Sequence, residues 1–419
     1  MAQTKPKAAQ FYGVSGDGTA GQVLISDGNG GMAWGANTEL FTVSWNTPTG
    51  QSLTYTQPSP QSSQGTAGST FPTTTFTATK SGEEISGTAT IAGLPTGITA
   101  TQSLSGSGAD NVLTVTLAGV FPGADSLNTA LTISGLTIAV PITVDYLVVA
   151  GGGAGGGHVA PNAYGAGGGA GGYLTGTENT AVIGTNYLIT VGAGATSGTN
   201  GSNSQAFSTT ATGGGGGGWY TSGQPASSIG KDGGSGGGGS SGWAGSGMPP
   251  FPGGSKVSGQ GNDGGECNNS GGYQSAGGGG AGAAGANVSG AGGAGGNGGV
   301  GLSSTITGSS VFYAGGGGGE GWNGVAGAGG NGGGGAGASY NPTVGPAVSG
   351  TANTGGGGGG TAGTAGAGGA GGSGIVILRY PSSYAITVPG GLTATTDSTT
   401  VANTKITTFT AGTGNIQFN

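Results

Sequence analysis

Gly151-Gly-Gly-Ala-Gly-Gly-Gly157 opens the stretch that decides the fold of this chain. Further blocks of nearly pure glycine follow at residues 213–218, 236–239, 315–319 and 355–360. They alternate with segments that carry aromatic residues, prolines and a few charges, and most of the 112 glycines lie between residues 151 and 374. Because glycine has no side chain to bury, these blocks cannot form a hydrophobic core of their own.

Backbone physics limits what such blocks can do. Ordering a residue costs roughly 1–2 kcal/mol of backbone entropy, more for glycine, and a net hydrogen bond returns only about 0.5–1.5 kcal/mol. Helix is disfavoured, and a glycine sheet has nothing to pack on its faces. The remaining regular conformation is the extended left-handed helix with three residues per turn, which makes no internal hydrogen bonds. The blocks are therefore predicted to bond laterally to one another as a stiff bundle.

A flexible glycine linker is the alternative interpretation of the same composition. Three features favour order: the blocks lack charge and proline, their lengths are similar, and apolar strand-like segments flank them. Alanines in Ala-Gly-Gly rhythm, as at residues 165–172 and 290–296, would place methyl groups on one face of a three-residue helix.

Composition argues against several classes of function. Only 5% of the residues are charged and the net charge is −7 with a single arginine, Arg379, so a nucleic-acid or phosphate-binding surface is not expected. One cysteine, Cys267, gives no disulfide framework or zinc cluster, and one histidine, His158, offers little for acid–base catalysis. The acidic residues of the glycine-rich stretch are scattered through its loops and are expected to be solvated charges: Glu178, Asp232, Asp263, Glu266 and Glu320. Its Gly-x-Gly-x-x-Gly matches lack the strand and helix that a nucleotide site needs. We expect no enzyme activity, no cofactor and no metal.

The N-terminal segment lacks the apolar core of a signal peptide, and no run approaches the ~18 apolar residues of a membrane span. We expect an extracellular protein released by lysis of the cell that makes it, as viral proteins are. Residues 1–37 are predicted to be a small head, with strands at residues 22–26 and 32–34 joined by Asp27-Gly-Asn-Gly30. The stretch Gly18-Thr-Ala-Gly-Gln-Val-Leu24 to Trp34 resembles an N-terminal unit of trimeric phage tail-fibre proteins, which implies virion attachment and a homotrimer, although the glycine-rich stretch could fold within one chain.

Residues 38–145 read as a β domain. Thr, Val, Ile and Leu alternate in seven candidate strands separated by Pro and Gly turns. The expected strands are residues 40–45, 52–56, 74–79, 86–91, 111–117, 130–133 and 137–144. This pattern predicts an immunoglobulin-like sandwich acting as a spacer; carbohydrate binding is the other reading.

The glycine-rich domain, residues 146–381, is bounded by two apolar strands. Asp145-Tyr-Leu-Val-Val-Ala150 enters the first block and Gly374-Ile-Val-Ile-Leu-Arg-Tyr380 leaves the last, so we expect these strands to pair. Together with Tyr187-Leu-Ile-Thr-Val191 and Ser309-Ser-Val-Phe-Tyr313, this region resembles the glycine-rich domain of phage tail-fibre and adhesin proteins. The resemblance covers residues 144–381 and implies a polyglycine II lattice whose connecting loops bind the host surface.

Aromatic residues in those loops are the candidate binding residues. If the blocks alternate in direction, residues 158–164, 219–232 and 320–326 gather at the end opposite the paired strands. The sequence does not decide at which end residues 240–276 lie, because this segment could contain another block at 259–265. Trp and Tyr offer large contact area with a polar handle, although they could equally seal the ends of the bundle. The candidates are His158, Tyr164, Trp219, Tyr220, Trp243, Phe251, Tyr273, Trp322 and Tyr340.

Residues 382–419 are predicted to form a small C-terminal β tail that locks subunits together or packs back onto the base. The whole chain is thus expected to be all-β plus irregular structure. We expect a phage tail-fibre or tip adhesin that binds a bacterial surface protein or glycan and joins other virion proteins. The alternative is a purely structural virion appendage or surface filament; an ice-binding bundle would need a flatter and more regular face.

Overall fold

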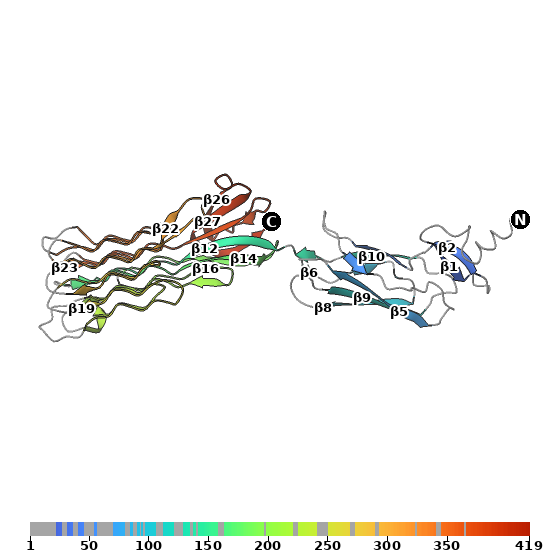
Figure 1. Cartoon of the computed structure of the whole chain (residues 1–419), viewed down its shortest axis with the longest axis horizontal. Coiled ribbons are helices and arrows are strands. Elements are labelled where there is room, and N and C mark those ends of the chain that lie inside the picture. The colour runs from blue at the N-terminus through green and yellow to red at the C-terminus, as the bar shows by residue number, and fades with distance from the viewer. Residues whose placement is uncertain are drawn as a thin grey trace. The chain divides into compact units, whose positions relative to one another are not determined.

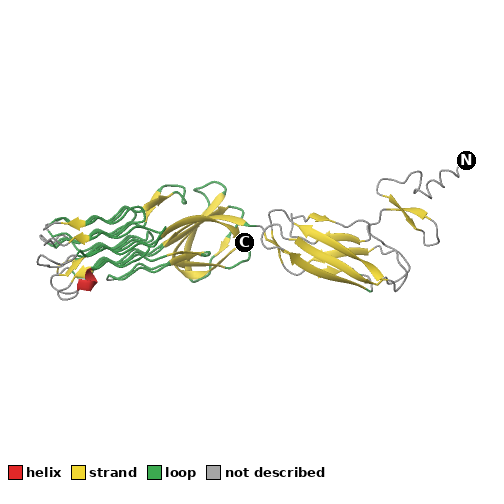
Figure 2. Ribbon diagram, turned by 60° about the horizontal axis from the view of Figure 1, so that its bottom comes forward, coloured by secondary structure: helices red, strands yellow, loops and turns green. Residues whose placement is uncertain are grey.

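The computed structural model divides the chain into two compact units, Met1–Val140 and Pro141–Asn419. In the first unit it describes strands β1 to β11 with residues 94 and 97. In the second it describes residues 141–157, 163–196, 198–220, 225–240, 250–268, 273–289, 293–322, 325–340, 345–363 and 366–419. The described regular structure is β apart from one short 3₁₀ turn, η1 (Pro225–Ser228), and Figure 2 shows this predominance of strand and extended chain.

The first unit begins with the predicted hairpin. Strands β1 (Gln22–Ser26) and β2 (Met32–Ala36) pair antiparallel, with Leu24 opposite Trp34. The strands that follow form three sheets, ordered β4-β5-β9-β8, β3-β10-β7 and β11-β6. Their bounds are β3 Phe41–Trp45, β4 Thr54–Thr56, β5 Thr70–Thr79, β6 Glu84–Ser86, β7 Thr90–Ala92, β8 Ile98–Ser105, β9 Val112–Val120, β10 Thr129–Ser134 and β11 Thr137–Ala139.

Strand β9 shows the alternation of buried and partly exposed residues that is typical of a β-strand. Leu113, Val115 and Leu117 of β9 are buried, and the residues between them are partly exposed, as expected for a strand with one face in the core. β8 was missed in the sequence because only Ile98 of its residues is buried, so it carries almost no apolar signal. The all-β prediction is confirmed; an immunoglobulin-like arrangement stays a prediction.

The second unit is built on a nine-stranded sheet that is nearly closed (Figures 1 and 2). Its main path runs β14-β12-β24-β27-β15-β16-β17, with β25 and β26 also paired to β27. The strands are β12 Ile142–Val149, β14 Tyr173–Ala181, β15 Tyr187–Val191, β16 Ser204–Ala206, β17 Thr209–Ala211, β24 Ile375–Pro381, β25 Ile386–Thr387, β26 Leu392–Asp397 and β27 Thr404–Phe418.

The predicted pairing of the two flanking strands is confirmed. β12 and β24 run antiparallel, with Val149 opposite Ile375. Alternate residues of both strands face two different clusters of buried side chains, one containing Val148 and Val376 and the other containing Leu147 and Ile377. Burial on both faces explains why these strands read as continuous apolar runs.

The C-terminal residues do not form a separate small sheet. The 15-residue strand β27 pairs with β24 through residues 404–409 and with β15 through residues 412–416. Phe409 and Phe418 on β27 are completely buried in the larger cluster. The tail therefore packs back into the base and completes its core.

The glycine-rich segments extend from this sheet as a bundle of extended chains (Figure 1). In residues 167–172, successive amides donate to the carbonyl oxygens of residues 276, 358, 215, 279, 355 and 212, at 2.7–3.0 Å. The neighbour thus repeats every third residue, and three different chains surround this one. A β-strand alternates between two neighbours, so the bundle is bonded in three directions, as lateral bonding between three-residue helices predicts.

The interior of this bundle is backbone. Residues 151–156, 164–172, 213–218, 233–240 and 355–363 are all buried. A Cβ at Gly317 would lie 2.0 Å from the carbonyl oxygen of Gly358, and one at Gly357 would lie 2.0 Å from that of Gly168. No side chain fits at such distances, so the sequence is glycine wherever two chains approach this closely.

Candidate functional site

The end of the bundle opposite the sheet carries most of the predicted loop aromatics. There, β13 (Ala163–Gly165) pairs with β18 (Trp219–Tyr220) on one side and with β23 (Ala362–Gly363) on the other. We call this small sheet, with Tyr273, Trp322 and Tyr340 beside it, the tip.

Four aromatic rings form one cluster at the tip. Trp322 stacks between Tyr273 and Tyr340, with ring centroids 4.2 and 4.6 Å away and interplanar angles of 26° and 9°. Tyr164 lies against all three rings, at 5.1–6.3 Å. Tyr164 is buried, whereas the three stacked rings are partly exposed. Within this cluster the three stacked rings therefore offer aromatic surface to a partner, and Tyr164 packs beneath them.

A layer of buried polar side chains lies where the glycine segments meet the tip. Glu320 is completely buried, and neither of its carboxyl oxygens makes a hydrogen bond of ordinary geometry. Ser240 Oγ donates to the Tyr164 carbonyl at 2.6 Å and lies 3.2 Å from Ser275 Oγ. Ser339 and Thr361 are also buried, with hydroxyls that make no hydrogen bond. Buried polar groups without partners are costly, so this layer lowers the stability of the bundle.

The carboxyl of Glu320 sets the electrostatics of the layer. Burial raises its pKa well above the usual value, and the Ser275 side chain offsets this only in part. Burial likewise raises the pKa of Tyr164, with the charge of Glu320 as the next cause. Both groups therefore favour their neutral forms, so neither places a charge beneath the tip.

Phe251 lies in a different environment. Its ring is 4% exposed and packs with Cys267, Ala276 and Val288 in a small apolar cluster. Its backbone exchanges two hydrogen bonds with Cys267, at 2.9 Å each. It has no exposed ring with which to touch a receptor and instead closes the side of the bundle near Gly239.

The segments that alternating blocks are expected to bring to one end do lie together. Residues 163–165, 219–220 and 320–322 meet there, with Trp219 and Tyr220 partly exposed on β18. The uncertain segment 240–276 does contribute a short extra pass, since Gly264 and Gly265 donate to Gly254 and Gly277. His158 and Trp243 lie outside the described residues. Receptor binding by any of these residues stays a prediction.

Sequence reasoning missed the polar layer. Ser240, Glu320 and Thr361 each directly follow a glycine block, at residues 236–239, 315–319 and 355–360. The first side chain after a block falls where the backbone-filled interior ends, and this position is the signal that could have found them.

The described residues hold no group of three or more His, Cys, Asp or Glu side chains placed to bind a metal ion. In the same residues no helix has the length and hydropathy needed to cross a bilayer.

Comparison with known proteins agrees with this architecture. The chain belongs to a glycine-rich domain family, which matches residues 128–381. No curated protein and no solved structure matches it. The match begins one residue before β10 and ends at the last residue of β24, so it contains the bundle and both strands that flank it.

Proposed function

We propose that this protein is a bacteriophage tail-fibre or tip adhesin whose glycine segments form a polyglycine II lattice. The support for the lattice is the three-residue repeat of hydrogen-bonded neighbours together with interior carbonyls that leave no room for Cβ atoms. In this proposal residues 1–37 attach the chain to the virion, and three copies assemble. The β strands up to residue 145 act as a spacer, and the lattice holds the tip rigidly.

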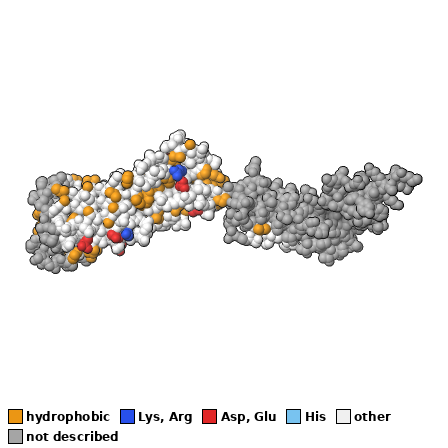
Figure 3. Space-filling model, viewed as in Figure 1, with side chains coloured by type: hydrophobic (Ala, Val, Ile, Leu, Met, Phe, Trp, Pro, Cys, Tyr) orange, Lys and Arg blue, Asp and Glu red, His pale blue; other side chains and the backbone are white. Residues whose placement is uncertain are grey.

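The observation that carries the adhesin proposal is the partly exposed Tyr273–Trp322–Tyr340 stack at the end of the bundle. Stacked Trp and Tyr rings give a preordered contact surface, and such rings lose little entropy on binding. Few charged side chains are visible on the described face of the second unit (Figure 3). Recognition of a bacterial surface protein or glycan would then rest on aromatic and hydrogen-bonding contacts and depend weakly on salt.

Binding of the full-length protein to a panel of bacterial strains tests this proposal. Wild-type protein carrying a fluorescent label should decorate one or more strains and block adsorption of phage that infect them. Trp322→Ala should reduce decoration at least tenfold. Phe312→Ala is the matched control, because Phe312 is an aromatic residue 42% exposed on β22 (Val311–Tyr313), outside the tip.

A purely structural role is the competing function. Val300, Leu302, Val311 and Phe312 are 37–47% exposed, an apolar set that neighbouring subunits could cover. If Trp322→Ala leaves decoration unchanged, or no strain is decorated while the protein assembles with other virion proteins, the adhesin proposal is wrong.

A further inference from the structure

A groove of about 410 Å³ lies on the base, away from the tip residues. Strands β12, β14 and β24 form one wall, and residues 303–306, which continue from β21 (Leu302–Ser304), form the other. The groove combines one ion pair, several hydroxyl groups and two tyrosines, Tyr146 and Tyr173, and none of these was singled out as a site by the sequence.

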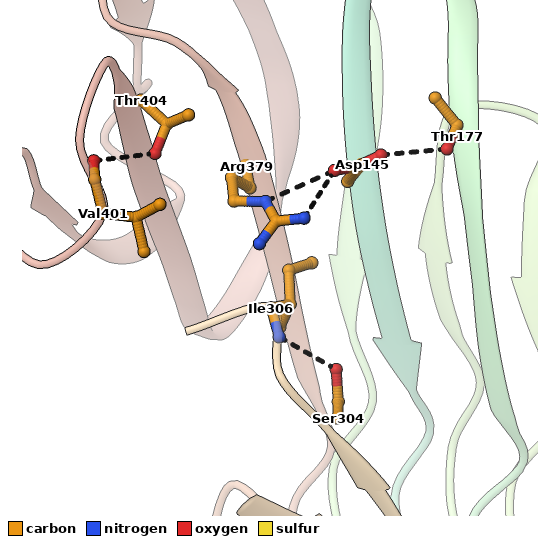
Figure 4. A network of polar contacts seen from close by, with 7 residues as sticks. All are labelled: Asp145, Thr177, Ser304, Ile306, Arg379, Val401 and Thr404. Atoms are coloured by element: carbon orange, nitrogen blue, oxygen red, sulfur yellow. Dashed lines mark hydrogen bonds and ion pairs between the residues drawn. The ribbon is translucent and has the colours of Figure 1, made fainter. Parts of the chain in front are cut away.

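The ion pair lies in the wall of the groove (Figure 4). Arg379 on β24 is directly opposite Asp145 on β12, and its Nη2 and Nε donate to Asp145 Oδ2 at 2.8 and 3.3 Å. Thr177 on β14 donates from Oγ1 to the other carboxylate oxygen at 2.9 Å. The Arg379 and Asp145 side chains are still 30% and 39% exposed, so a ligand can reach both.

Hydrogen-bonding capacity remains after these contacts. Arg379 uses Nε and Nη2, which leaves the Nη1 protons for a ligand. Burial alone would raise the pKa of Asp145, but the hydrogen bonds from Arg379 and Thr177 and the charge of Arg379 hold it below its usual value. The carboxylate is therefore ionised at neutral pH and cancels the guanidinium charge. A neutral ligand suits this pair better than an anion or a cation.

The rest of the lining has the same character. Tyr173 donates from its hydroxyl to the Ser303 carbonyl at 3.2 Å, which links the two walls. Thr175, Thr177 and Ser303 are exposed and carry hydroxyl groups. An ion pair with a planar guanidinium, neutral hydroxyls and the ring of Tyr173 match a sugar, whose hydroxyls bond to the polar groups while its C–H face packs on the ring.

We propose that this groove binds a neutral saccharide, with Arg379 and Asp145 holding adjacent hydroxyl groups. The proposal is independent of the tip and of the adhesin function. It gives the base a binding role in addition to supporting the bundle.

Saturation-transfer difference NMR on the full chain tests the proposal. The probes are glucose, galactose, mannose and N-acetylglucosamine at millimolar concentration, with glucuronate as a charged comparison. We expect saturation transfer to at least one neutral sugar and no tighter binding of glucuronate than of glucose.

Two variants locate the binding. Arg379→Lys keeps the charge but loses the planar guanidinium group, and should raise the dissociation constant at least fivefold. Thr175→Val replaces an exposed hydroxyl with a methyl group and does not touch the ion pair. This variant should raise the dissociation constant about two- to fivefold. Val348→Ala, at an exposed residue outside both the groove and the tip, should leave the dissociation constant unchanged. Absence of transfer to every neutral sugar, preference for glucuronate, or affinity unaffected by both groove variants would overturn the proposal.

Discussion

The base and the bundle of the second unit are held together in opposite ways. The base buries side chains, with Phe409, Phe418 and Val376 inside a nearly closed sheet. The bundle buries backbone, and every third amide of residues 167–172 returns to the same neighbouring chain. A core of side chains fails when atoms are removed, whereas a core of carbonyl oxygens fails when atoms are added. Variants of the two regions should therefore behave differently.

The largest expected effect is the removal of a side chain from the base. Phe409 is completely buried and lies opposite Val376. Phe409→Ala leaves a cavity and should lower the free energy of unfolding by about 3–5 kcal/mol. Chemical denaturation of the full chain measures this, and a loss below about 1 kcal/mol would mean that the base does not depend on side-chain packing.

Adding one methyl group to the bundle should cost nearly as much. In Gly317→Ala the new Cβ would lie 2.0 Å from the Gly358 oxygen, so a chain must move. We expect a loss of about 3 kcal/mol. Gly390→Ala is the matched control, since a Cβ added there would have no atom within 4 Å apart from its chain neighbours, and the stability of this variant should change little. Equal effects of the two substitutions would contradict a tightly packed backbone core.

The pH dependence of stability tests the boundary between bundle and tip. The pKa of Glu320 is raised in the folded state, so the folded protein holds a proton that the unfolded chain releases. Stability is then greatest below the ordinary carboxyl pKa and falls as the pH rises towards the folded-state value, by up to about 1.4 kcal/mol per pH unit.

Glu320→Gln should remove this dependence and make the protein more stable than wild type at neutral pH. Glu266→Gln, at an exposed carboxyl, serves as the control and should keep it. Parallel pH profiles for wild type and Glu320→Gln, from denaturation between pH 4 and 8, would show that Glu320 is not protonated by burial.

The smallest effect is expected from surface charge. Lys256 and Asp263 form an ion pair at 4.0 Å, with side chains 43% and 56% exposed. Lys256→Ala should change the free energy of unfolding by less than about 0.5 kcal/mol, because exposed pairs contribute little. A loss above 1 kcal/mol by the same denaturation measurement would show that charge, and not backbone bonding alone, holds the bundle.

The sequence predicted the elements that carry a physical signal. Apolar runs at residues 145–150 and 374–380 marked β12 and β24, and glycine blocks marked the bundle. It did not give the bonding partners of each block, because identical glycines carry no register information. The polar strand β8 was missed for the same lack of signal.

The candidate site was predicted in part. Tip aromatics were found because Trp and Tyr stand out among glycines, but their burial was not, so the supporting place of Tyr164 and Phe251 appeared only in the structure. Glu320 was read as a solvated loop charge, and the structure buries it completely. Whether a residue next to a glycine block is buried depends on which chains surround it, and the sequence does not fix this.

Hydrogen exchange of the glycine amides tests the central claim most directly. The amides of Gly168, Gly215, Gly317 and Gly358 each donate to a carbonyl oxygen of another buried chain at 2.8–2.9 Å. The account predicts that they exchange as slowly as amides of β12 and β24, with protection that reports cooperative opening of the unit. Exchange at the rate of an unstructured glycine chain, while β12 and β24 stay protected, would contradict a core made of backbone.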